Sequence, residues 1–273
     1  MNAFVLQMTS TPSIDDNINF VINSLRESRP PANSLVVLPE CFACFGGKDN
    51  LNLRFAEKIG TGDVQDKLSK IAKDFQIYLV AGSFPTHSAN PDKFMASSLV
   101  FAPDGKLISD YQKIHLFDVV VADSTGSYRE SDSTVPGNKL AVFDTSWGKV
   151  GLAICYDLRF PGLFQALRQL GADTIVLPSA FTERTGSAHW LPLLQARAIE
   201  NQVYMVAANQ NGVHQNGRET YGHSMVVSPW GKVLANAERN NGLFGAELDT
   251  NKMHEIRKNM PVFNHNKFQA RLK

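Results

Sequence analysis

The stretch Lys149-Val150-Gly151-Leu152-Ala153-Ile154-Cys155-Tyr156-Asp157-Leu158-Arg159-Phe160-Pro161 contains the transition on which the predicted fold depends. An apolar run of strand character ends on Cys155, and a helix is expected to begin a few residues later. The thiol is therefore expected at the carboxyl end of a strand, beside free backbone N–H groups of the following turn. Such N–H groups can lower the pKa of a thiol and can hold a developing oxyanion. A free cysteine is more often a small buried core residue, so the rest of the chain must decide between the two interpretations.

Strand and helix patterns alternate along the chain. Apolar runs of strand type occur at residues 4–8, 35–39, 77–82, 97–101, 107–111, 174–178 and 203–208, and helices are predicted at 14–25, 63–75 and 189–201. Ser13 is placed to cap the first helix, and the turn Pro103-Asp104-Gly105 is placed to close a β-hairpin. Residues 118–138 are predicted to form a long polar loop.

Three segments of the second half repeat patterns of the first half in the same order. Residues 174–178 resemble 35–39, residues 203–208 resemble 77–82, and residues 223–232 resemble 97–106. This order indicates an internal duplication of an α/β unit. Two sheets packed face to face with helices outside would bury all these elements. We therefore predict one α/β domain over residues 1–273 with two similar halves, because no linker composition separates them.

The composition excludes several classes of partner. The net charge is +1, from 27 basic and 26 acidic residues without a long like-charge run, so neither nucleic acid nor an acidic membrane surface is an expected partner. Three cysteines argue against a disulfide framework, and no apolar run is long enough for a membrane span. The first residues read directly as a strand rather than a signal peptide. These observations predict a cytoplasmic protein.

Three residues with complementary chemistry follow predicted strands: Glu40, Lys113 and Cys155. A carboxylate beside a thiol can take its proton during attack and return it to a leaving amine. A cationic lysine can stabilise a thiolate and, with the backbone N–H of Tyr156, the oxygen of a tetrahedral intermediate. Taken singly, Glu40 could instead cap the next turn, and Lys113 could be a solvated strand end.

Three motifs around these residues resemble the nitrilase, or carbon–nitrogen hydrolase, superfamily. They are Leu38-Pro39-Glu40, Tyr111-Gln112-Lys113-Ile114-His115-Leu116 and Gly151–Pro161, in family order and at family-like spacing over nearly the whole chain. The resemblance implies a Glu-Lys-Cys triad that acts through a thioester without a cofactor. It also implies that Glu130 orients the lysine, that the fold is a four-layer α-β-β-α sandwich, and that the chain forms homodimers or higher homo-oligomers.

Further segments resemble one branch of this superfamily, the deaminated glutathione amidases. They are Pro178-Ser179-Ala180-Phe181, Thr185-Gly186, His189-Trp190, Ala196–Glu200, Tyr221–Val227 and Met260–Phe263. The resemblance implies hydrolysis of deaminated glutathione to 2-oxoglutarate and cysteinylglycine. The sister ω-amidases, which act on 2-oxoglutaramate, share much of the pattern, and a nitrile or N-carbamoyl amine substrate stays open. A catalytically silent binding protein is a further alternative, against which the intact triad argues.

Two departures from the branch pattern do not touch the triad. Gly162 stands where an acidic residue is more usual, and the tail His265-Asn266-Lys267-Phe268 replaces a more basic one. Because this tail commonly packs at subunit contacts, the departure bears on the oligomeric state.

Substrate recognition must be argued from chemistry, because an oxo-acid amide carries at least one carboxylate. Arginine binds carboxylate through two parallel hydrogen bonds. We predict that Arg184, in a loop spanning 181–185, binds this carboxylate, and that Phe181 and Thr185 line the pocket as the resemblance implies. Arg159 is instead expected to brace the cysteine turn through an ion pair.

Other reactive side chains have less support. Cys41-Phe42-Ala43-Cys44 has the spacing of a redox or zinc motif but lacks a second ligand pair or a thioredoxin-like context, so we expect thiols near the pocket. His115 is close enough to Lys113 for a Cys–His scheme, but the resemblance favours Glu40 as the base. The seven histidines show no metal-binding spacing, and no phosphate loop follows a strand, so no metal and no cofactor are predicted.

Overall fold

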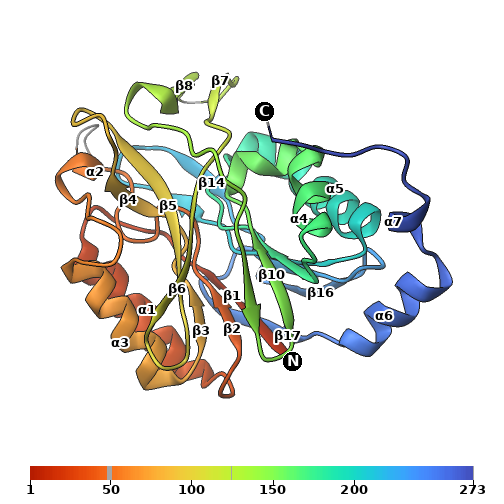
Figure 1. Cartoon of the computed structure of the whole chain (residues 1–273). Helices are drawn as coiled ribbons and strands as arrows, with labels where there is room; N and C mark the ends of the chain where they lie inside the picture. The colour runs from red at the N-terminus through yellow and green to blue at the C-terminus, as the bar shows by residue number, and fades with distance from the viewer. Residues whose placement is uncertain (48–50, 124, 273) are drawn as a thin grey trace.

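Two β-sheets form the centre of the molecule in a computed structural model that describes residues 1–47, 51–123 and 125–272 (Figure 1). The first sheet has the order β17 (Gly242–Glu247), β1 (Asn2–Gln7), β2 (Leu35–Val37), β3 (Tyr78–Val80), β5 (Phe94–Phe101) and β4 (Phe84–His87), with β6 (Leu107–Gln112) pairing with β5. The second has the order β16 (Val233–Asn236), β15 (Met225–Val227), β12 (Tyr204–Ala207), β11 (Thr174–Val176), β10 (Gly148–Leu152) and β9 (Val142–Thr145). Two separate hairpins join β7 (Asp118–Val120) to β8 (Ser127–Arg129) and β13 (Asn211–Val213) to β14 (Glu219–Tyr221).

The two sheets repeat one topology. In the first, β1, β2 and β3 are parallel, with antiparallel β17 on one side and antiparallel β5 on the other. In the second, β10, β11 and β12 are parallel between antiparallel β9 and β15. The strands that resemble one another in sequence occupy equivalent places, so the predicted duplication is confirmed.

Helices cover the outer faces of both sheets. α1 (Ile14–Ser28) and α3 (Asp63–Phe75) lie outside the first sheet, and α4 (Pro161–Gln169) and α5 (Glu183–Asn201) lie outside the second (Figure 1). The remaining helices are α2 (Leu51–Arg54), α6 (Thr250–Asn259) and α7 (Val262–His265), and short 3-10 turns occur at Glu130–Asp132 and Cys155–Arg159. No helix in the described ranges is long and apolar enough to cross a membrane.

The packing of β2 shows how the layers are held together. Val36 belongs to the core formed with α1 and α3, whereas Leu35 and Val37 belong to the core formed with the second sheet, and all three side chains are buried. This division follows from the alternation of side chains along a strand. The predicted four-layer α-β-β-α sandwich with two similar halves is thereby confirmed.

Several local predictions are confirmed. The Ser13 side chain caps α1 by accepting a hydrogen bond from the Asp16 N–H, and α3 has the predicted bounds. The C-terminal tail also reaches Gly162, because a Cβ atom at that position would lie 3.7 Å from the Cβ atom of Ala270. The tail therefore passes over the start of α4.

Two segment predictions are wrong. α5 begins at Glu183 rather than at His189, because the Thr182 side chain caps it by accepting the Thr185 N–H. Gly186 concealed this start, since glycine disfavours helices; here it lets α5 approach Tyr221, whose ring a Cβ atom at 186 would overlap. The segment 118–138, predicted as loop, contains the β7–β8 hairpin and a 3-10 turn.

One glycine holds the end of β2 close to the end of β3. Gly82 has φ of +48°, and a Cβ atom at this position would overlap the carbonyl oxygen of Pro39, the residue before Glu40. Left-handed backbone disfavours residues with a Cβ atom. The approach therefore requires glycine for two reasons, conformation and contact.

We predict that Gly82→Ala lowers the free energy of unfolding by about 2–4 kcal/mol, because strain and overlap add. Gly60→Ala is the matched control, since Gly60 has φ of +89° but no atom within 4 Å of a Cβ position. It should cost only about 1–2 kcal/mol. Urea unfolding of both variants measures the difference, and equal losses would show that the contact with Pro39 contributes nothing.

Candidate active site

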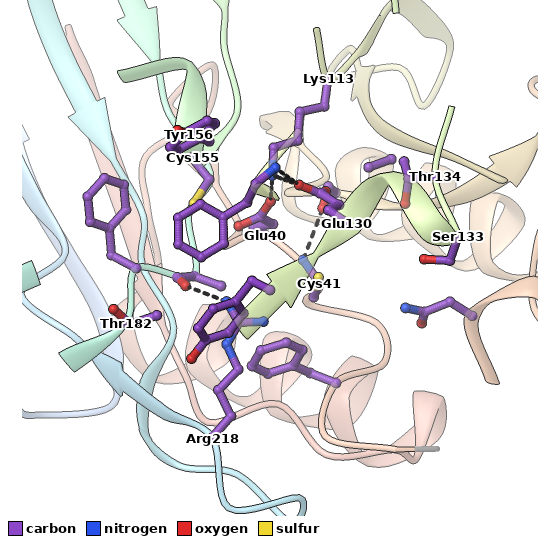
Figure 2. Close-up of a pocket in the computed structure, with 18 of the residues that line it drawn as sticks. Glu40, Cys41, Lys113, Glu130, Ser133, Thr134, Cys155, Tyr156, Thr182 and Arg218 are labelled. Atoms are coloured by element: carbon purple, nitrogen blue, oxygen red, sulfur yellow. Dashed lines mark hydrogen bonds and ion pairs between the residues drawn. The ribbon is translucent and has the colours of Figure 1, made fainter. Parts of the chain in front are cut away.

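One lysine and two glutamate side chains meet near the carboxyl ends of the strands (Figure 2). Lys113, which follows β6, lies with its Nζ 2.8 Å from Glu40 Oε1, and Glu40 follows β2. The same Nζ lies 3.0 and 2.8 Å from the two carboxylate oxygens of Glu130, at the start of the turn after β8. The Lys113 side chain is only 2% exposed. The structure thus brings together three of the predicted residues that lie far apart in the sequence.

Cys155 lies beside this cluster, at the start of the 3-10 turn that follows β10. Its φ is +46°, a left-handed conformation that is uncommon for a residue other than glycine, and its N–H donates to the Pro178 carbonyl at 2.8 Å. The thiol lies beside the Glu40 carboxylate and the Ala180 backbone, and both act on its pKa: Glu40 raises it and the Ala180 backbone lowers it. The Glu40 carboxylate therefore lies close to both the ammonium group of Lys113 and the sulfur of Cys155 (Figure 2). Strained backbone of this kind is often found where a side chain has to be aimed at a site.

Burial and neighbouring charge set the protonation states of the cluster. Burial alone would lower the pKa of Lys113, but the carboxylates of Glu130 and Glu40 outweigh it and hold that pKa well above its usual value. Burial, followed by the charge of Glu40, raises the pKa of the Cys155 thiol well above its usual value. Burial also raises the pKa of Glu130, which Lys113 opposes. At neutral pH the lysine is therefore charged and the thiol keeps its proton next to an acceptor carboxylate.

Asp157 fastens the cysteine turn to the segment that carries Lys113. Its Oδ2 accepts hydrogen bonds from the Ile154 N–H at 2.8 Å and the Tyr111 hydroxyl at 2.8 Å. Its Oδ1 accepts from the His115 N–H at 3.2 Å and lies 2.7 Å from His115 Nδ1. Tyr111 and His115 flank Lys113, and Ile154 precedes Cys155. One fully buried carboxylate therefore fixes the position of the thiol relative to the lysine.

A glutamine from the second half of the chain holds the backbone of Glu40 in place. The Nε2 of Gln210 donates to the Glu40 backbone carbonyl at 2.9 Å and to the Ser10 hydroxyl at 2.6 Å, and its Oε1 accepts from the Ser10 N–H at 3.0 Å. Gln210 is fully buried. Nothing in its sequence context marked it in advance, because an isolated glutamine after a strand has no characteristic pattern.

The charged cluster opens into a cavity of about 310 Å³. Of the residues predicted to bind substrate, Phe181 and Thr185 line it, as does Tyr156. The Tyr156 backbone N–H donates to no acceptor among the described residues. The prediction for Arg184 is wrong: α5 begins at Glu183, so Arg184 occupies the first helical turn, is exposed and does not line the cavity.

Three other arginines line the cavity instead: Arg129, Arg159 and Arg218. Arg159 lies over the rings of Tyr156 and Phe181, 5.9 and 5.4 Å from their centroids. The expected ion pair of Arg159 is not formed with any described residue, because the nearby buried carboxylate of Asp157 is already taken up by four other donors. Arg218, which the sequence analysis overlooked, follows the turn signal Asn216-Gly217 in the β13–β14 hairpin. That signal predicts a hairpin but not that it folds over the cavity.

The other reactive side chains have structural environments. His115 is hydrogen-bonded to Asp157 and stacked on Phe160 at 3.7 Å, so it pairs with neither Cys155 nor a metal. Cys41 and Cys44 line the cavity, as predicted for thiols near the pocket. Burial raises the pKa of Cys44 to about 11. Among the described residues, no group of three or more His, Cys, Asp or Glu side chains is arranged to hold a metal ion.

We predict that Asp157→Asn lowers the free energy of unfolding by about 2–5 kcal/mol. The amide nitrogen of asparagine cannot accept a hydrogen bond, so two or more of the donors that face Asp157 are left unpaired. Asp110→Asn, on the exposed face of β6, is the control and should change stability by less than about 0.5 kcal/mol. Chemical unfolding and the rate of Cys155 alkylation measure the two consequences. A stable Asp157→Asn protein with unchanged alkylation would show that the turn is held by other contacts.

Comparison with known proteins identifies the family of this chain. The model of the carbon–nitrogen hydrolase family matches residues 3–258. A deaminated glutathione amidase from Yersinia enterocolitica is 40% identical over 272 residues, covering 99% of this chain and 94% of that protein. The human omega-amidase NIT2 is also 40% identical, over 259 residues that cover 94% and 91% of the two chains. The crystal structure of Saccharomyces cerevisiae Nit3, a member of branch 10 of the nitrilase superfamily, superimposes with a TM-score of 0.86 at 33% identity, covering 98% and 97% of the two chains. The chain therefore belongs to the carbon–nitrogen hydrolase family.

Proposed function

We propose that the protein is a cofactor-free thiol amidase that hydrolyses the C–N amide bond of a small carboxylated substrate. The observation that carries this proposal is the position of the Glu40 carboxylate, which forms an ion pair with the ammonium group of Lys113 and lies beside the thiol of Cys155 at a buried end of an open cavity. This arrangement provides a nucleophile, a proton acceptor and a fixed positive charge within one site.

In the acylation half of the reaction, Glu40 takes the thiol proton as the sulfur attacks the amide carbonyl carbon. The carbonyl oxygen becomes an oxyanion, which the Lys113 ammonium and the Tyr156 N–H stabilise. Glu40 then returns its proton to the amide nitrogen, the C–N bond breaks, and the amine leaves. The acyl group stays on Cys155 as a thioester.

Hydrolysis of the thioester repeats these roles with water. Glu40 takes a proton from the attacking water, and the same two groups hold the second oxyanion. The C–S bond then breaks, the sulfur recovers a proton from Glu40, and the carboxylic acid product leaves. Glu130, which also accepts the Phe117 N–H at 2.7 Å, keeps Lys113 charged and in position throughout.

The substrate that we propose is deaminated glutathione, hydrolysed to 2-oxoglutarate and cysteinylglycine. A deaminated glutathione amidase among the relatives supports this choice, but the omega-amidase is equally similar at 40% identity, so 2-oxoglutaramate is the alternative. The guanidinium groups of Arg159 and Arg218 support a carboxylated substrate, because both line the cavity and neither forms an ion pair with a described residue.

We further propose that the chain is a single domain that assembles as a homodimer or larger homo-oligomer in the cytoplasm. Exposed apolar side chains on the outer helices and the tail support the assembly, namely Leu191, Ile199, Phe263 and Phe268. The three cysteines are all free, which fits a reducing compartment.

We predict that the purified protein releases 2-oxoglutarate from deaminated glutathione faster than from 2-oxoglutaramate, and that Cys155→Ala abolishes both reactions. Coupled detection of 2-oxoglutarate measures each rate, and Cys44→Ala is the control, since this thiol also lines the cavity but has no role in the proposed chemistry. A preference for 2-oxoglutaramate would keep the mechanism and make the protein an ω-amidase. Full activity of Cys155→Ala would exclude the mechanism.

Replacing Glu40 by glutamine should separate its two effects on the thiol. The Glu40 charge contributes to the raised pKa of Cys155, so its removal should move the pH profile of Cys155 alkylation to lower pH. Amide hydrolysis should nevertheless fall by about 10²–10⁴-fold, because the proton acceptor is lost. Alkylation by iodoacetamide and amide turnover, each measured from pH 5 to pH 10, test both statements. Parallel changes in the two rates would argue against Glu40 as the base.

A further inference from the structure

Arg218 is a cavity-lining cation whose hydrogen-bonding capacity is not filled by the protein. Its Nη2 donates to the Ala180 carbonyl at 3.2 Å, whereas its buried Nε has no hydrogen-bond partner among the residues that the structure describes. It forms no ion pair with the described residues, and its guanidinium lies 5.0 Å from the centroids of both the Phe45 and Tyr128 rings. The rings stabilise the cation without using its N–H donors, which leaves the planar edge of the guanidinium available to an anion.

The position of Arg218 indicates which half of the substrate it can contact in the proposed reaction. Phe45, on which the guanidinium lies, belongs to the same segment as Glu40 and Cys41. In Figure 2 the Arg218 side chain points into the cavity from its lower wall, while Lys113 enters from the upper wall. Arg159 has a different setting, because its guanidinium lies over the rings of Tyr156 and Phe181.

Because Glu40 returns its proton to the departing nitrogen, the amine half of the substrate must leave past Glu40 and its segment. A carboxylate on that amine would then meet Arg218. The charge of Arg218 also acts on the segment that carries Glu40. Burial and Glu40 raise the pKa of Cys41, and Arg218 partly offsets this rise.

We propose that Arg218 binds a carboxylate on the leaving-amine half of the substrate and so selects amides of amino acids or short peptides over amides of ammonia. The inference rests on the proposed function and extends it, because it assigns the recognition of the leaving group to a residue of the β13–β14 hairpin. It also gives a physical basis for choosing between the two candidate substrates, since only deaminated glutathione carries a carboxylate on its amine half.

The test compares two substrates that differ in this carboxylate alone: deaminated glutathione and its C-terminal glycinamide. Wild type should lose about tenfold or more in kcat/KM on the glycinamide, mainly through KM, because a charge-assisted hydrogen bond is lost. Arg218→Gln should lose about tenfold or more on the acid and show no preference between the two, while Arg218→Lys should retain part of the preference. Arg26→Gln, exposed at the end of α1, is the charge-matched control and should behave as wild type.

An equal loss of kcat/KM on both substrates in Arg218→Gln, or a preserved preference, would overturn the inference. The comparison of the two substrates on wild type also needs no folded variant, and equal rates there would overturn it as well. The outcome for the proposed function is read separately: if wild type hydrolyses neither amide, the amidase assignment fails.

A binding measurement tests Arg218 without turnover. Calorimetry on Cys155→Ala should show that cysteinylglycine binds about tenfold more tightly than cysteinylglycinamide. The double variant Cys155→Ala with Arg218→Gln should show no such difference. Equal affinity of the two peptides for Cys155→Ala would overturn the inference whatever the result of the hydrolysis assay.

Discussion

The Lys113 ammonium, held between Glu40 and Glu130, is the interaction on which the rest of this structure depends. The side chains of Lys113 and Glu40 are almost completely buried and that of Glu130 is partly buried, and burying a charge is costly unless partners compensate it. The two glutamates compensate the lysine, and the neighbouring thiol keeps its proton. Buried ion pairs are weak evidence for stability. The cluster is better explained by what it does to the neighbouring Cys155 than by any contribution to folding.

The surrounding fold can be understood as the means of holding this cluster together. Glu40, Lys113 and Cys155 follow β2, β6 and β10, so they belong to both sheets and can meet only if strand ends from the two halves converge. Asp157 joins the lysine segment to the cysteine turn across the two halves, and Gln210 joins the second half to the backbone of Glu40. These buried polar groups stabilise the fold only if each donor has a hydrogen-bond partner, because a partly satisfied network would leave costly unpaired donors.

The internal duplication supplied two copies of the framework but only one copy of the chemistry. The segment Leu38-Pro39-Glu40 after β2 has its equivalent in Leu177-Pro178-Ser179 after β11. In the first half this strand end presents the carboxylate; in the second half the Pro178 carbonyl accepts the Cys155 N–H and Ser179 is buried. One strand end therefore presents a reactive group and its counterpart supports the nucleophile, which explains why repeats visible in the sequence do not imply two sites.

The parts of this molecule that sequence could predict are those with a local physical signature. Apolar runs marked the buried parallel strands, the cap at Ser13 marked a helix start, and strand ends marked the residues of the cluster. Arg184 and Arg218 show the limit. Both are arginines near turn or loop signals, and the difference between them is set by whether a segment starts a helix, as at Glu183, or folds back over a cavity, as at the β13–β14 hairpin. The convergence of four donors on Asp157 is likewise a long-range property, since its partners range from Ile154 to residues more than forty positions away.

The raised pKa of Cys155 determines when the thiol loses its proton in the proposed reaction. A thiolate formed before substrate arrives would be a second negative charge in contact with Glu40, in a site where burial already disfavours charge. Keeping the proton on sulfur until attack avoids that repulsion and keeps a reactive anion from forming in the empty cavity. When the sulfur attacks, the proton moves to Glu40 and the negative charge moves to the substrate oxygen, where Lys113 and the Tyr156 N–H can stabilise it. On this view the site is arranged for the charge distribution of the transition state rather than for that of the resting enzyme.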